Sequence, residues 1–164
     1  MNGIAHLKKE AWVGGASNAV FNGLIAWLLL RSGPSLAWSG EHSFVVDIIA
    51  TALLLPLIVA AIVIPLQRAK LRKGKLQPIA LGDRSTWQAI ADRYPGTTGK
   101  SALMFGLTGV CVIAPVTLLG LFMFGVEQFS PEHYALFKGA WAGVMAAVLV
   151  IPMVLVALRP ASNH

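Results

Sequence analysis

Residues 44–66 read FVVDIIATALLLPLIVAAIVIPL, and this stretch decides the fold. A helix needs about 20 mainly apolar residues to cross the roughly 30 Å hydrocarbon core of a bilayer. In this run the polar exceptions are Asp47 and Thr51. The apolar residues are continuous and do not alternate with polar ones, as they would in a strand of a membrane β-barrel. The stretch therefore predicts a transmembrane helix.

Three further stretches share this character, at about residues 11–30, 101–126 and 134–158. Hydrophobic residues make up 56% of the chain and charged residues 12%, which is about half the charged share of a soluble globular protein. This composition excludes a soluble domain. We expect one transmembrane domain over residues 1–164, an all-α polytopic membrane protein with four transmembrane helices arranged as two helical hairpins.

The basic residues orient the predicted bundle, because cytoplasmic flanks carry an excess of Lys and Arg. Of the thirteen basic residues, Arg31 and Lys138 fall on one side and eleven on the other: Lys8, Lys9, Arg68, Lys70, Arg72, Lys73, Lys75, Arg84, Arg93, Lys100 and Arg159. The pattern predicts that both chain ends and the central loop, residues 67–100, are cytoplasmic.

The N-terminal stretch has a competing interpretation as a cleaved signal peptide. Lys8 and Lys9 precede an apolar run, and Ser35-Leu36-Ala37 follows it. The apolar regions of signal peptides usually span about 7–15 residues, whereas this run is longer and contains Asn18 and Asn22. The length favours a retained first helix.

The second and fourth spans share a local pattern. AIVIP at 61–65 resembles VLVIP at 148–152, and Arg68 or Arg159 follows shortly after. Either the two hairpins are parallel repeats, related by an axis along the membrane normal, or helices rich in Val, Ile, Leu and Ala match by chance.

Small residues recur at four-residue spacing on the first and fourth helices. Such stripes let helices approach closely where lipid provides no hydrophobic drive for association. They predict tight helix contacts, within the bundle or between protomers, at Ala11, Gly15, Ala19, Gly23, Gly139, Gly143 and Ala147.

A few polar residues fall inside the predicted spans. Asn18 and Asn22 point the same way from the first helix and should face protein, water or a ligand. Either they form an interhelical hydrogen bond, which we favour, or they bind a ligand. Asp47 and Lys138 have opposite signs at similar depth, so either they pair or Lys138 extends to the headgroups. Thr51, one turn from Asp47, is a candidate hydrogen-bond partner for it.

The central loop begins with a basic cluster, Arg68, Lys70, Arg72, Lys73 and Lys75, which we expect to lie against anionic lipid headgroups. This location accounts for the net charge of +6 without nucleic acid.

A short helix is expected over residues 85–94. Ser85 and Gln88 have capping-box spacing, and an apolar face carries Trp87 and Tyr94. This face either anchors in the membrane interface or docks a cytoplasmic partner.

The sequence contains no pattern typical of catalysis or of metal binding. Cys111 is the single cysteine, and the four histidines are scattered, with His6, His42 and His164 expected to be solvated. Serine–histidine pairs, paired carboxylates and phosphate-cradling loops are missing from the predicted spans. We therefore expect no metal, no cofactor and no enzymatic activity.

The chain resembles small uncharacterised four-span inner-membrane proteins of Gram-negative bacteria. The resemblance rests on Gly14-Gly15, Asn18, Asn22, Ile25-Ala26-Trp27, Pro65 and Arg72-Lys73-Gly74-Lys75. It covers mainly the first hairpin and the start of the loop. It implies a bacterial inner-membrane location and supplies no activity or ligand.

Two functions fit these features. The first is a non-catalytic structural or interaction subunit of a membrane complex, forming a homo- or hetero-oligomer. The alternative is a small oligomeric transporter or channel built from paired hairpins, modestly favoured by Pro56, Pro65, Pro115 and Pro152, since broken helices can mark a transport site.

Overall fold

The computed structural model describes residues 3–82 and 85–160, so Arg84 and His164 lie outside the described residues. Within these ranges, four helical stretches are long and apolar enough to cross a membrane. The first, second and last are α1 (Gly3–Leu30), α2 (Phe44–Arg72) and α6 (Pro131–Ala157). The third consists of α4 (Thr98–Thr108), a π-helical turn η1 (Gly109–Ile113) and α5 (Ala114–Met123). The predicted all-α, polytopic fold is confirmed.

Two helices extend further than predicted. The first begins at Gly3 rather than near residue 11, because its first turns bury His6 and Leu7 against the rest of the chain. The second continues past residue 66 to Arg72 and ends where Gly74 takes a positive φ of 66°, a conformation that favours glycine. Part of the basic cluster therefore lies on α2 and not in a loop.

The other predicted helix ends are within a few residues. Ser130 caps α6 by accepting a hydrogen bond from the backbone N–H of His133, and Pro131 takes the first helical position, where its missing N–H costs nothing. The short helix α3 (Thr86–Asp92) begins after Ser85, whose side chain accepts from the backbone N–H of Gln88.

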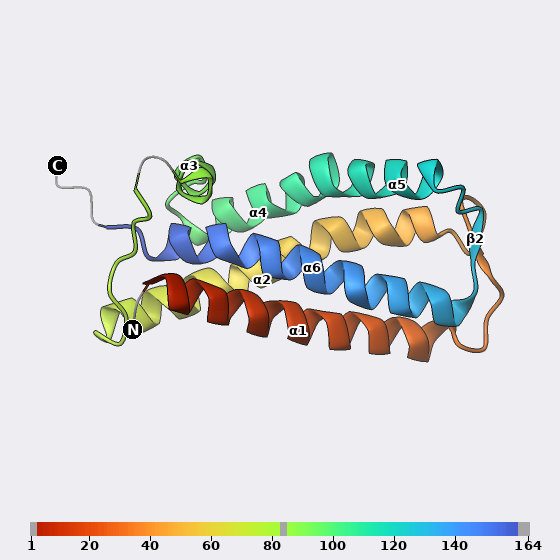
Figure 1. Ribbon diagram of the computed structural model, residues 1–164, viewed down its shortest axis with the longest axis horizontal. Coiled ribbons are helices and arrows are strands. Elements are labelled where there is room, and N and C mark those ends of the chain that lie inside the picture. Colours follow the sequence, from red (N-terminus) through yellow and green to blue (C-terminus); the bar gives the residue numbers. More distant parts are fainter. Residues whose placement is uncertain (1–2, 83–84, 161–164) are drawn as a thin grey trace.

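The last helix, α6, is the centre of the bundle. In the most apolar stretch of α6, 67% of the residues are buried inside the protein, compared with 11% in the corresponding stretch of α1. The first helix packs along α6, and α2 packs against α4, α5 and α6. Consecutive long helices run antiparallel, as hairpins do (Figure 1). However, the backbones of α1 and α2 lie apart over most of their length, with side-chain contacts near the chain termini, and this separation leaves room for the candidate site.

The third span and α2 cross at glycine. A Cβ added at Gly109 would lie 1.7 Å from the backbone oxygen of Ala52, so no other residue fits at this crossing. Gly109 opens the π-helical turn that precedes Pro115. Proline removes one helical hydrogen bond, and a π-turn is a usual way for a helix to accommodate such an interruption.

The two hairpin loops meet at the end of the bundle opposite the chain termini (Figure 1). Strands β1 (Leu36–Ala37) and β2 (Gln128–Phe129) pair antiparallel there, and the Trp38 indole N–H donates to the carbonyl of Val126 at 2.7 Å. Strands of two residues are too short to leave a periodic signal, so the sequence did not predict them.

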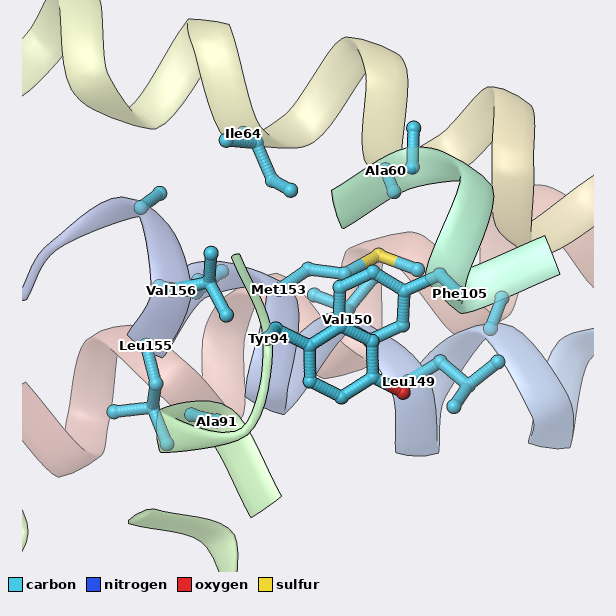
Figure 2. Close-up of a cluster of buried hydrophobic side chains, with 14 of the residues drawn as sticks. Ala60, Ile64, Ala91, Tyr94, Phe105, Leu149, Val150, Met153, Leu155 and Val156 are labelled. Atoms are coloured by element: carbon cyan, nitrogen blue, oxygen red, sulfur yellow. The ribbon is translucent and has the colours of Figure 1, made fainter. Parts of the chain in front are cut away.

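At the terminal end, α3 lies across the long axis of the bundle (Figure 1). Its apolar side packs on the protein: Ala91 is buried, and Trp87 is partly buried against the same core. Tyr94 stacks on Phe105, with ring centroids 3.9 Å apart, as Figure 2 shows. Tyr94 is therefore not on the face expected to anchor in the interface or to dock a partner, because the chain turns at Pro95-Gly96 towards α4 and folds the ring into the core.

Candidate functional site

A groove of about 340 Å³ lies between α1 and α2. It gathers four polar residues that the sequence singled out on two separate helices, Asn18, Asn22, Asp47 and Thr51. The rest of its lining is small or apolar: Ala50, Leu54, Leu55, Ile58 and Val59. The groove exists because α1 packs on α6 and leaves α2 almost untouched over this length.

The two asparagines bond within their own helix. Asn18 Nδ2 donates to the carbonyl of Gly14 at 2.8 Å, and Asn22 Nδ2 donates to the carbonyl of Asn18 at 3.0 Å. The expected interhelical hydrogen bond is not formed, because the groove separates α1 from α2 here. Each carboxamide thus uses an N–H on its own helix, and its oxygen can still accept a hydrogen bond from a molecule in the groove.

Asp47 and Lys138 form an ion pair between α2 and α6. Lys138 Nζ lies 2.7 Å from both carboxylate oxygens, and the Tyr134 hydroxyl donates to Asp47 Oδ2. The Lys138 side chain is 13% exposed and that of Asp47 is 37% exposed. Lys138 therefore stays in the bundle and does not extend to the headgroups. At membrane depth each charge stabilises the other.

Tyr134 is a site residue that the sequence analysis missed. It lies one turn before Lys138 on α6, so the four-residue spacing places both on one face. That spacing is the signal that could have identified it. The partners of the Asp47 carboxylate in the described residues are Lys138 and Tyr134, whereas Thr51 lines the groove without a hydrogen bond to it.

The groove is therefore lined by polar groups against an apolar background. The amide oxygens and the exposed side of the Asp47 carboxylate accept hydrogen bonds, while the second N–H of each amide and the Thr51 hydroxyl can donate them. Among residues 3–82 and 85–160, no group of three His, Cys, Asp or Glu side chains is placed to hold a metal ion.

The two stripes of small residues pack against each other within one chain. A Cβ added at Gly143 would lie 2.7 Å from the Ala19 Cβ and 3.0 Å from the Gly15 oxygen. At Gly15 and Gly23 an added Cβ would lie 2.9 Å from the Ala147 Cβ and 3.3 Å from the Gly139 Cα, respectively. The stripes hold α1 on α6, so packing within one chain accounts for them.

A buried polar contact joins α1 and α2 near the chain termini. His6 Nε2 lies 3.0 Å from Gln67 Oε1, and both side chains are buried, at 3% and 0% exposure. The expectation that His6 is solvated is wrong, because α1 begins at Gly3 and places His6 inside the bundle. Glu10, one turn further along α1, lies 3.6 Å from Lys70 on α2.

The basic cluster divides between internal contacts and the surface. Lys70 pairs with Glu10, and Arg68 donates to Thr98 Oγ1 and to the carbonyl of Gly96. Arg72, Lys73 and Lys75 are exposed. Arg68 and Lys70 thus also connect α2 to other parts of the fold, which the sequence did not predict.

These contacts describe a multi-pass membrane protein with a polar groove between two of its membrane-spanning helices. Comparison with family models, curated proteins and solved structures finds no match to this chain.

Proposed function

We propose that this protein is a non-catalytic interaction subunit of a membrane complex, and that its α1–α2 groove receives a transmembrane helix of a partner. The observation that carries the proposal is the lining of the groove by Asn18, Asn22, Asp47 and Thr51 between two helices that barely touch. Lipid chains offer no hydrogen bonds to such groups, whereas Ser, Thr, Asn or Gln on a partner helix would satisfy them.

The surface of α1 supports the same proposal. Only 11% of the residues in its most apolar stretch are buried inside the protein. Large apolar side chains such as Val20, Phe21 and Ile25 are more than half exposed. A helix lying in the groove would contact α1 and α2 together and cover part of this surface. The small-residue stripes are already used against α6, which leaves the groove as the polar surface open to a partner.

A path for a solute through one chain has less support. Phe44, Ile48 and Phe105 are fully buried between the helices and fill the space that a conduit would need. Transport therefore requires two or more copies whose grooves face each other, and this stays the alternative function.

The proposed location is the bacterial inner membrane, with both chain ends in the cytoplasm. Its support is the excess of Lys and Arg at the terminal end of the bundle, together with the resemblance described above.

Native mass spectrometry of the protein extracted gently from its own membrane tests the proposed function. We expect an unlike membrane protein at fixed stoichiometry, lost in the double variant Asn18→Leu/Asn22→Leu. Ser17→Leu is the matched control, because Ser17 is an exposed polar residue of α1 that does not line the groove. A homo-oligomer that carries flux sensitive to Asn18 and Asn22 would replace the proposal with the transport alternative.

A further inference from the structure

A second hollow, of about 390 Å³, lies where α2 ends near the chain termini. It is separate from the groove and is lined by Pro65, Arg68, Leu71, Arg72 and Thr98. Two guanidinium groups thus border one hollow beside apolar carbon. Guanidinium is the side-chain group best suited to bind phosphate, because its planar fork donates two parallel hydrogen bonds.

Arg68 is held in place before any ligand binds. Its Nη1 donates to Thr98 Oγ1 at 3.0 Å, and its Nη2 donates to the carbonyl of Gly96. A guanidinium has five N–H donors, so these two bonds leave three for an anion. Because the side chain is already ordered, binding costs less conformational entropy than binding by a free arginine.

Positive charge in the hollow is not balanced by the protein. Arg72 follows Arg68 by four residues on α2, a spacing at which like charges repel. Among residues 3–82 and 85–160, no carboxylate lies within 4 Å of either guanidinium. The nearby carboxylates of Glu10 and Asp92 pair instead with Lys70 and Arg159. An anion between the two arginines would remove this repulsion.

The depth of the hollow indicates where the anion comes from. The 29 residues of α2 make a helix of about 43 Å, which exceeds the roughly 30 Å hydrocarbon core. The last turns of α2 therefore extend into the headgroup layer, where lipid phosphates lie. Pro65 and Leu71 add apolar surface that a free phosphate ion would not use.

We propose that this hollow binds the phosphate of one anionic phospholipid between Arg68 and Arg72, with Pro65 and Leu71 against its glycerol and first acyl carbons. This is a discrete site for one lipid, distinct from general attraction of the basic cluster to the membrane surface. The proposal does not depend on the function assigned to the groove.

Lipid titration of the purified full chain, read by native mass spectrometry, tests the site. We expect wild-type protein to retain one phosphatidylglycerol at concentrations where phosphatidylcholine of the same chain length is not retained. Arg72→Gln should bind about tenfold more weakly, the loss expected for one charged hydrogen-bonded contact of about 1.4 kcal/mol. Lys75→Gln removes the same charge just beyond the helix and outside the hollow, and it should keep the lipid.

A second variant separates geometry from charge. Arg68→Lys keeps the charge but loses the planar fork, and it should also weaken lipid binding. If Arg72→Gln and Lys75→Gln lose lipid affinity equally, the proposal is overturned, because the lipid is then held by the general positive charge of the surface. Displacement of the lipid by millimolar inorganic phosphate would overturn the lipid assignment. Because the Arg72 side chain is exposed, its variant should unfold at the wild-type temperature.

Discussion

Asp47 and Lys138 connect α2 to α6 in the half of the bundle away from the chain termini, and Tyr134 adds a hydroxyl donor to the same carboxylate. Removing one member of a buried ion pair costs more than the pair itself contributes, because the remaining charge stays in a poor solvent. The partial exposure of Asp47 reduces this cost, since its carboxylate borders the groove and is not fully enclosed by protein.

We expect Asp47→Asn to lower the free energy of unfolding by about 1–3 kcal/mol, below the roughly 3–5 kcal/mol for a fully buried pair. Lys138→Met should cost less, because the charge that it leaves unpaired, Asp47, is the more exposed of the two. Thermal unfolding in one detergent measures both. The exchange Asp47→Lys/Lys138→Asp should recover part of the lost free energy of unfolding. If it recovers nothing beyond the single variants, the pair does not stabilise the fold.

His6 and Gln67 give a second residue-scale prediction. His6→Leu leaves the fully buried amide of Gln67 without the hydrogen bond from α1, which should cost about 1–3 kcal/mol. The double variant His6→Leu/Gln67→Leu should be more stable than His6→Leu, because it also removes the buried amide that His6→Leu leaves without its partner. Chemical denaturation of the four proteins forms a double-mutant cycle. Additive effects would show that the contact does not link α1 to α2.

Between elements, the closest approach of α1 and α6 depends on glycine. We expect Gly143→Ala to destabilise the protein by about 1–3 kcal/mol, because the new Cβ would meet Ala19 at 2.7 Å and the backbone of Gly15. Gly120→Ala on α5 is the control, since nothing lies within 4 Å of its Cβ position. Alanine favours helix by about 0.5–1 kcal/mol over glycine, so the control should unfold at an equal or higher temperature. Equal effects at both glycines would contradict the close α1–α6 contact.

At the scale of the whole molecule, the basic end of the bundle should face the cytoplasm. In a Cys111→Ala background, Lys75→Cys and Glu41→Cys place single thiols at opposite ends of the bundle, both at exposed positions. We expect a membrane-impermeant thiol reagent to label residue 41 in intact spheroplasts and to label residue 75 only after lysis. The reverse pattern would invert the topology and would also move the proposed lipid site to the outer leaflet.

The sequence by itself determined the number, the type and the approximate limits of the spans. These are properties of continuous segments: the run from 44 to 66 is too long and too apolar for any other structure. Four-residue spacing likewise indicated which faces of the first and fourth helices would approach closely, since α-helical geometry places residues i and i+4 on one side. The distribution of Lys and Arg predicted an orientation with both chain ends in the cytoplasm.

Only the tertiary structure decided which segments meet, because pairing depends on the shapes of all the helices together. It placed α1 on α6 instead of on α2, and this choice opened the groove that collects Asn18 and Asn22 with Asp47. It added Tyr134 to the ion pair, buried His6 and Tyr94, and bonded Arg68 to Thr98 and Gly96. A linear pattern records how one residue repeats along its own helix, but it does not record which distant side chain lies across the space between two helices.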